Sequence, residues 1–277
     1  MAHVRVITDS ASSLPAPLAA EHEVITVPMQ LEIAGRQIDE RAMSLKDVVA
    51  RLDEGVTTSG PSPGAFLEAL DGVSDAGAVI LTVGSRLSST YQAACIAARL
   101  TPDQGLVRVV DTATAAGAEG LVVLAAAEMA RADAPLDAVE ARAREIAKRV
   151  RLVASVGTLA HLARGGRVPG VAAWAGCRLG IRVLFEFNGG HIRPQRPCRS
   201  VDKAKDLIVQ QWQRSSLDGL PLHVAALHAV EEESALELLD RVRRQLQPAT
   251  SFLGTFGPVM VAHTGPDVIG LAWWWGP

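Results

Sequence analysis

Residues 78–83 read AVILTV, a continuous apolar run with the length of one strand. Such a run is typical of a strand that is covered on both faces, as in a parallel sheet. Residues 106–110 (LVRVV) repeat the pattern, and residues 4–7 (VRVI) and 24–27 (VITV) are two further candidate strands. Because helical patterns separate these runs, the first half of the chain is predicted to be an α/β domain with a Rossmann-like parallel sheet.

The helices expected between these strands have recognisable starts and lengths. Ser44 is predicted to cap a helix that runs to Leu52, and Asp47 occupies the capping-box position three residues later. An Ala-rich helix is predicted near residues 120–131, and another over residues 136–151. Helices in these places would cover both faces of the sheet.

The second half has a different order of elements. Residues 183–187 and 191–194 flank an Asn-Gly-Gly turn, and Asn-Gly is a strong hairpin signal. The other expected elements are helices over 201–212 and from Glu232, and strands over 222–227, 252–255 and 268–275. We therefore expect a smaller α+β domain with a mixed, largely antiparallel sheet over residues 154–277, packed on the first domain over residues 1–153. With no linker between them, the two should leave a crevice for a ligand.

The composition is that of an ordinary globular protein. Of the 277 residues, 48% are hydrophobic and 21% are charged. The formal net charge of −3 gives no electrostatic reason to expect nucleic acid as a partner. Arginine clusters around Arg144 and Arg241 have acids at helical spacing, so we interpret them as solvated helix faces.

Nothing in the sequence suggests export or a membrane span. The N-terminal residues lead directly into a strand and lack the layout of a signal peptide. No apolar run approaches the roughly 18 residues that cross a bilayer. Cys95, Cys177 and Cys198 are odd in number and form no CxxC pair, which favours thiols in a reducing compartment. We therefore expect a cytoplasmic protein.

Two hydroxyl-rich turns are the clearest functional signal. Residues 57–63 read TTSGPSP and residues 85–91 read SRLSSTY, and each turn precedes a helical apolar pattern. Hydroxyls and backbone N–H groups gather at such helix starts, where a negative charge is favoured. Neither turn has a carboxylate cluster or a metal-ligand spacing nearby. The pattern therefore indicates binding of a small anion rather than metal chemistry.

Two later segments add groups that suit an anion. Gly165-Gly166-Arg167 supplies a guanidinium, and His263-Thr264 supplies an imidazole and a hydroxyl. These groups are suited to a carboxylate or a phosphate. Each has an ordinary structural explanation as well, because Ser and Thr cap helices and Gly-Gly permits a turn. Spacing alone does not establish that the four segments meet.

The motifs, taken in order, resemble the DegV family, bacterial acyl-binding proteins that act with fatty acid kinase. The matching stretches run almost from end to end of the chain. They are Ile7-Thr8-Asp9-Ser10 with Leu14-Pro15, Thr58-Ser59 with Pro61-Ser62, Leu87-Ser88 with Thr90-Tyr91-Gln92, Thr158-Leu159 with Gly165-Gly166-Arg167, the Gly189, Ile192 and Arg199 region, and His263-Thr264-Gly265-Pro266.

The resemblance implies that one long-chain fatty acid is bound between the two domains. It implies a carrier that is not itself an enzyme and uses no cofactor, and whose partner is the ATP-binding subunit of fatty acid kinase. The residues expected to hold the carboxylate are Thr58, Ser88, Arg167 and His263, with Ser59, Ser89 and Thr264 beside them.

Four positions depart from the family pattern. Gly60 stands where the family usually has Gln, and Ser89 stands where it has Gly. Thr112 replaces the usual Ser, and Val183 replaces a Pro. Ser89 bears most directly on function, because it adds bulk to the turn expected to hold the head group.

Two enzyme classes are alternatives to a carrier. A serine hydrolase would use Ser88 or Ser89 with His263 and Asp111, aligned in one hydrogen-bonded line. The chain lacks the Gly-x-Ser-x-Gly elbow of many such enzymes. It also lacks the glycine-rich phosphate-binding motifs of nucleotide-using enzymes. The carrier hypothesis is therefore preferred.

The C-terminal run Trp273-Trp274-Trp275 is unusual in a chain with 4% aromatic residues. On a strand, Trp273 and Trp275 share one face and Trp274 takes the other. We expect all three to pack on the two faces of a terminal strand. The alternative is that one exposed tryptophan makes a partner contact or a transient membrane contact.

Overall fold

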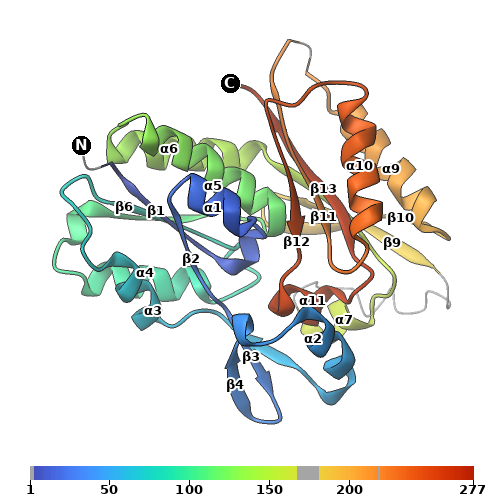
Figure 1. Cartoon of the computed structure of the whole chain (residues 1–277), viewed down its shortest axis with the longest axis horizontal. Helices are drawn as coiled ribbons and strands as arrows, with labels where there is room; N and C mark the ends of the chain where they lie inside the picture. The colour runs from blue at the N-terminus through green and yellow to red at the C-terminus, as the bar shows by residue number, and fades with distance from the viewer. Residues whose placement is uncertain (1–2, 167–180, 218) are drawn as a thin grey trace.

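The computed structural model describes residues 3–166, 181–217 and 219–277. Figure 1 shows two large sheets side by side, with helices between and outside them, and a small third sheet below. We call them sheet A, sheet C and sheet B, respectively.

Sheet A is parallel throughout. Its strands lie in the order β2-β1-β6-β7. They are β1 (Arg5–Asp9), β2 (Val24–Val27), β6 (Ala78–Thr82) and β7 (Val107–Asp111). Every residue of β6 is buried, as a strand covered on both faces requires. The predicted parallel sheet is thereby confirmed.

Helices cover both faces of sheet A. They are α1 (Ala16–Glu21), α3 (Pro63–Leu70), α4 (Thr90–Leu100), α5 (Ala116–Arg131) and α6 (Leu136–Arg149). Helix α2 (Leu45–Arg51) packs instead on α11 (Pro258–Thr264), near sheet B (Figure 1). The Ser44 hydroxyl accepts a hydrogen bond from the backbone N–H of Asp47 at 3.1 Å, which confirms the predicted cap. Helix α5 begins four residues earlier than predicted.

Helix α5 lies between sheet A and sheet C, and nearly all of it is buried. Two glycines permit this close packing. A Cβ on Gly117 would lie 2.7 Å from Leu227 Cδ2, and one on Gly120 would lie 2.7 Å from the Ser12 carbonyl oxygen. Because glycine has a poor helix propensity, the sequence alone did not predict a helix over residues 116–119. The close packing at Gly117 and Gly120 explains why the helix nevertheless includes them.

Sheet C has six strands in the order β10-β9-β8-β13-β11-β12, and all neighbours are antiparallel except β11 and β12. The strands are β8 (Arg151–Val156), β9 (Arg182–Asn188), β10 (His191–Cys198), β11 (Leu222–His228), β12 (Thr250–Thr255) and β13 (Ile269–Trp275). Helices α9 (Val201–Arg214) and α10 (Glu232–Arg243) cover the face turned away from α5 (Figure 1). The predicted mixed, largely antiparallel sheet is confirmed.

Sheet B was not predicted. It is antiparallel, in the order β4-β3-β5, with β3 at Gln30–Ile33, β4 at Arg36–Asp39 and β5 at Thr57–Ser59. Ala34 and Gly35, at φ 51° and 73°, form the tight turn between β3 and β4. Alanine is uncommon at a positive φ, so the sequence carried only half of the usual hairpin signal.

The three C-terminal tryptophans are buried, with 0%, 2% and 6% exposure for Trp273, Trp274 and Trp275. Trp274 stacks on His223 with 4.0 Å between ring centroids, and the Arg142 guanidinium lies 5.1 Å from its ring. Packing on both faces of the strand is confirmed, and the alternative of an exposed tryptophan is wrong.

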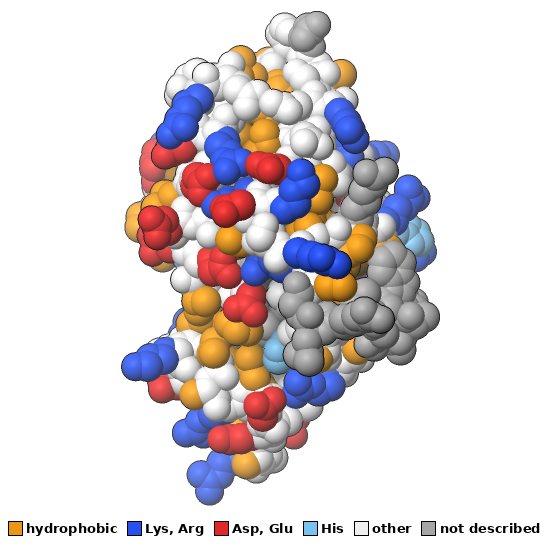
Figure 2. Space-filling view, turned by 90° about the vertical axis from the view of Figure 1, so that its right-hand side faces the viewer, with side chains coloured by type: hydrophobic (Ala, Val, Ile, Leu, Met, Phe, Trp, Pro, Cys, Tyr) orange, Lys and Arg blue, Asp and Glu red, His pale blue; other side chains and the backbone are white. Residues whose placement is uncertain are grey.

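The arginine clusters are paired with acids. Figure 2 shows the face that carries α9 and α10, where side chains of both charges are interspersed. On this face Arg241 pairs with Asp206 at 2.9 Å and with Glu237 at 2.6 Å. On α6, Arg144 pairs with Glu140 at 2.8 Å. Arg144 and Arg241 therefore lie on solvated helix faces, as interpreted from the sequence, whereas Arg142 of the first cluster packs on the Trp274 ring.

Cys95 and Cys198 are free thiols, and Cys177 lies outside the described residues. Within the described ranges, no helix combines the length and apolar character that crossing a membrane requires.

Candidate functional site

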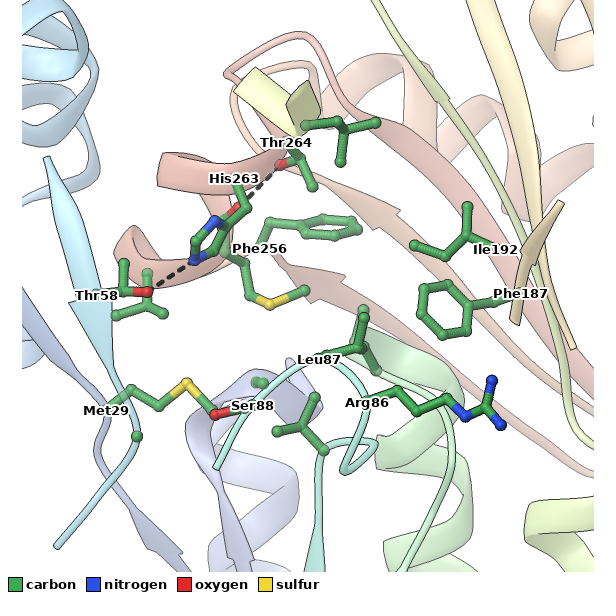
Figure 3. A pocket seen from close by; sticks show the side chains of 18 of the residues that line it. Met29, Thr58, Arg86, Leu87, Ser88, Phe187, Ile192, Phe256, His263 and Thr264 are labelled. Atoms are coloured by element: carbon green, nitrogen blue, oxygen red, sulfur yellow. Dashed lines mark hydrogen bonds between the residues drawn. The ribbon is translucent and has the colours of Figure 1, made fainter. Parts of the chain in front are cut away.

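A cavity of about 470 Å³ lies where the three sheets meet. This volume is within the range of small-molecule sites. The carboxyl ends of β1 and β6 border it, as is usual for ligands of parallel sheets. Its wall comes from β5, the turn at residues 85–89, the β9–β10 hairpin and helix α11 (Pro258–Thr264). Figure 3 shows these side chains converging on one space.

One end of the cavity is polar and joins both halves of the chain. Thr58 Oγ1 on β5 lies 2.7 Å from His263 Nε2 on α11, although 205 residues separate the two in sequence. Figure 3 shows the imidazole directed at the threonine hydroxyl. Both side chains are half-buried. This pair offers a hydroxyl and an imidazole to an anion at the same place.

Ser88 lies at the same end, in the turn that follows β6. Its Oγ is 2.8 Å from Thr90 Oγ1 and accepts a hydrogen bond from the Thr90 backbone N–H at 3.3 Å. Figure 3 places Ser88 on the side of Met29, facing the cavity. The structure thus gathers Thr58, Ser88 and His263, as the resemblance implied.

Gly60 explains how the two hydroxyl-rich turns come together. A Cβ at this position would lie 2.5 Å from Thr90 Oγ1 and 3.2 Å from Ser88 Oγ. Real Cβ atoms essentially never come as close as 2.5 Å to another heavy atom. The two turns can therefore approach this closely because position 60 is glycine and not the Gln that the family pattern has there.

Three other expected site residues line the cavity in different ways. Ser59 is half-buried, and Ser89 is exposed at the start of α4. Thr264 is buried, and its hydroxyl lies within hydrogen-bond distance of the carbonyl oxygens of Met260 at 3.1 Å and Gly265 at 3.2 Å. The Thr264 hydroxyl thus already has hydrogen-bond acceptors at the end of its own helix.

Arg167 lies outside the described residues, but the helix that precedes it contacts the site. Helix α7 (Ala160–Gly165) packs on α11. A Cβ on Gly165 would lie 2.7 Å from His263 Nδ1, and one on Gly265 would lie 2.6 Å from His161 Cδ2. Glycine at both positions is therefore what lets the two helices place His263 at the cavity.

Two aspartates hold the loops that border the cavity. Asp9 accepts hydrogen bonds from the backbone N–H groups of Ala11 at 2.9 Å and Val83 at 2.8 Å. Burial raises the pKa of this carboxyl to about 7. Asp111 Oδ1 accepts hydrogen bonds from the backbone N–H groups of Ser85 at 3.1 Å and Ala113 at 2.8 Å.

These bonds bear on the hydrolase hypothesis. A triad needs serine, histidine and aspartate in one line. Here the Ser88 hydroxyl pairs with Thr90, the Nε2 of His263 faces Thr58, and Asp111 binds loop backbone. The geometry thus gives Ser88 and Asp111 structural partners in place of the triad contacts.

Nothing in the sequence indicated that Glu40 helps to build the site. It is 5% exposed and accepts hydrogen bonds from the Ser10 hydroxyl and from the backbone N–H groups of Met29 at 3.1 Å and Val259 at 3.3 Å. Burial raises its pKa above the usual value. Because Val259 belongs to α11, one carboxylate ties the helix that carries His263 to the end of β1 and the start of β3.

Most of the remaining cavity wall is apolar. It contains three of the five phenylalanines in the chain, Phe185, Phe187 and Phe256, together with Leu152, Leu162, Ile192, Met29 and Met260. Phe185 and Phe187 alternate along β9 and so share one face. That alternation is the sequence signal that would have identified them. No group of three or more His, Cys, Asp or Glu in the described part of the chain is arranged to hold a metal ion.

Comparisons with known proteins extend over the whole chain. The sequence profile of the family described as "Uncharacterised protein, DegV family" matches residues 3–275. A DegV domain-containing protein of Streptomyces coelicolor is 33% identical over 276 residues, which cover 97% of this chain and 97% of that protein.

Two solved structures have a similar fold. A DegV family protein from Thermus thermophilus, described by its fatty acid binding, has a TM-score of 0.88 and 28% identity, covering 99% of each chain. DegV from Bacillus subtilis, described as a fatty acid binding protein, has a TM-score of 0.85 and 26% identity, covering 99% of this chain and 100% of the other. The likeness thus extends over both large sheets.

Proposed function

This chain belongs to the DegV family, and on that premise we propose that its cavity binds one long-chain fatty acid. The carboxylate lies at the end formed by Thr58, Ser88 and His263, and the acyl chain follows the phenylalanine-lined wall. The observation that carries the proposal is the 2.7 Å contact between Thr58 and His263 at a polar end of a largely apolar cavity. Relatives described as fatty acid-binding support the same ligand.

The physical chemistry of this arrangement is favourable. Each methylene group removed from water contributes about 0.8 kcal/mol, so a long acyl chain gains on the order of 10 kcal/mol before the costs of binding. A buried carboxylate must recover its lost hydration through hydrogen bonds. Two hydroxyls and an imidazole supply donors for this purpose at the polar end.

Further contacts to the head group are part of the proposal. Arg167 follows Gly166 in sequence, and the neighbouring Gly165 packs against His263. Ser59, Ser89 and Thr264 line the same cavity. We further propose that the ligand lies between an N-terminal unit of residues 1–153 and a C-terminal unit of residues 154–277.

We infer that the protein is a carrier and that a separate kinase subunit phosphorylates the bound acid. In that reaction a carboxylate oxygen attacks the γ-phosphorus of ATP, and the products are an acyl phosphate and ADP. The family resemblance supports this role. The half-buried state of Thr58, Ser88 and His263 is consistent with a head group that another protein reaches.

Native mass spectrometry tests the ligand. Protein purified without detergent from a bacterial host is expected to carry one fatty acid per chain. After delipidation, isothermal titration calorimetry is expected to show uptake of one palmitic acid. A protein that carries no fatty acid and takes up none contradicts the proposal.

Matched arginine variants test the head-group contact. Arg167→Gln is expected to weaken palmitate binding by about 10- to 100-fold, because a hydrogen bond to a charged group contributes about 1.5–3 kcal/mol. Arg164→Gln is the control, since Arg164 is exposed on α7 and donates to the Leu52 carbonyl oxygen at 3.1 Å. Equal affinities in the two variants would place the head group elsewhere.

The kinase role has its own assay. The loaded protein, ATP and an ATP-binding subunit of fatty acid kinase are expected to form an acyl phosphate, which hydroxylamine traps as a hydroxamate. The subunit's own carrier serves as the positive control. If that control gives hydroxamate and this protein gives none, it does not serve this subunit.

A further inference from the structure

The cavity has a second polar end, formed by Arg86. Arg86 lies two residues before Ser88 in the same turn and lines the same cavity. Figure 3 shows its guanidinium on the same side of the cavity as Phe187 and Ile192, away from Thr58 and His263. One turn therefore contributes a hydroxyl to the head-group end and a cation to the opposite end.

The Arg86 guanidinium keeps most of its hydrogen-bonding capacity. Its Nη1 lies 3.3 Å from both ring nitrogens of His191 on β10. A guanidinium has five N–H donors. None of the ion pairs among residues 3–166, 181–217 and 219–277 includes Arg86. By contrast, Arg151 on sheet C pairs with Glu186 at 2.5 Å.

The stem of Arg86 lies beside the tip of the β9–β10 hairpin. Gly190 at the tip has φ 77°, and a Cβ built on it would lie 3.6 Å from both Arg86 Cδ and Ala113 Cβ. These are ordinary van der Waals distances, so the hairpin tip lies close to the aliphatic stem of Arg86, and the charged group lies at the rim of the cavity. The contact with His191 joins the cation to a segment about a hundred residues away.

We propose that the Arg86 end is a second polar subsite, and that the cavity takes long-chain α,ω-dicarboxylic acids as well as simple fatty acids. This rests on the proposed function, because it needs an acyl chain in the cavity with its first carboxylate at Thr58 and His263. A terminal methyl group gains nothing from a guanidinium. A terminal carboxylate does, because arginine binds it with two parallel hydrogen bonds and offsets its lost hydration.

Calorimetry with two probes of equal length tests the subsite. Palmitic acid and hexadecanedioic acid are titrated into the delipidated protein and into Arg86→Met, which keeps the stem and removes the charge. Arg86→Met is expected to weaken hexadecanedioate binding about tenfold and to change palmitate binding less than twofold. Diacids of 10 to 18 carbons are expected to show one optimal length in the wild type that Arg86→Met abolishes.

The control is Arg193→Met. Arg193 is exposed on β10 beside Ile192, does not line the cavity, and is expected to leave both affinities unchanged. Equal loss of both probes in Arg86→Met would mean that only the stem matters and would overturn the proposal, as would no loss of either. Wild-type protein that binds palmitate but rejects every diacid also overturns it while leaving fatty acid binding intact.

Discussion

Replacing Gly60 with alanine is expected to disturb the protein at its head-group site. The added Cβ would lie 2.5 Å from Thr90 Oγ1 and 3.3 Å from Thr90 Cα. Thr90 is fully buried at the start of α4, so neither atom belongs to a side chain that can swing aside. The turn that carries Ser88 must therefore move by several tenths of an ångström.

The magnitude follows from two opposed effects. Overpacking a well-packed site costs about 1–3 kcal/mol. Gly→Ala reduces the entropy of the unfolded chain, which contributes about 0.4–1 kcal/mol in the stabilising direction. We expect the free energy of unfolding of Gly60→Ala to fall by about 1–2 kcal/mol. Palmitate affinity is expected to fall as well, because Ser88 lies 3.2 Å from the same Cβ.

Gly64→Ala is the matched control. Gly64 lies in the first turn of α3, is exposed, and a Cβ there would meet nothing closer than Ser62 Oγ at 3.6 Å. This variant is expected to gain about 0.5–1 kcal/mol, as glycine to alanine does in helices, and to bind palmitate normally.

Urea denaturation and calorimetry measure both effects. The double variant Gly60→Ala/Thr90→Ala separates the clash from other causes, because it removes the nearest oxygen. Gly60→Ala is expected to cost less in the Thr90→Ala background than in the wild type, with a coupling of about 1 kcal/mol. A Gly60→Ala protein as stable as Gly64→Ala, with wild-type affinity, would refute the reasoning.

Three further predictions concern the site and its surroundings. Thr58→Val removes the hydroxyl that faces His263 and is expected to weaken palmitate binding about fivefold, which is the effect of one hydrogen bond. Calorimetry measures this loss. The control Thr57→Val, on the exposed face of β5, is expected to leave palmitate binding unchanged. The carboxyl of Asp9 keeps its proton in the native state up to about pH 7, while in the unfolded chain it loses the proton near pH 4. Its contribution to the free energy of unfolding is therefore fully present below pH 4 and is lost as the pH rises to 7. Asp9→Asn is expected to flatten the dependence of unfolding free energy on pH in that window, and an unchanged difference from wild type across it would contradict the raised pKa. A fluorophosphonate probe is expected to leave Ser88 unlabelled, whereas labelling that depends on His263 would restore the hydrolase hypothesis.

The sequence predicted the parts of the fold that local patterns encode. β6 is a run of apolar residues, and a strand covered on both faces needs nothing else to be recognised. The Ser44 cap and the β9–β10 turn are equally local. Sheet B was missed because its strands are short and its tight turn places Ala34 at a positive φ.

The site was less accessible to local reasoning. The turns at residues 57–63 and 85–91 were identified by their hydroxyls, but their contact depends on the missing Cβ of Gly60. The pairing of Thr58 with His263 joins segments 205 residues apart and was implied by the resemblance alone. A spacing pattern has no means of indicating which distant turn a given turn will touch.

Glu40 shows why such residues escape sequence reasoning. A single glutamate near the end of a short strand is ordinary on a protein surface, and nothing around it forms a motif. Its role depends on three donors that come from three separate segments, at Ser10, Met29 and Val259. Desolvation of the carboxylate raises its pKa, yet the carboxylate is one of the groups that hydrogen-bond α11 to the first half of the chain. The position of His263 relative to Thr58 therefore depends on Glu40, which is adjacent to neither residue in the sequence. Only the folded arrangement of the three donor segments reveals this role.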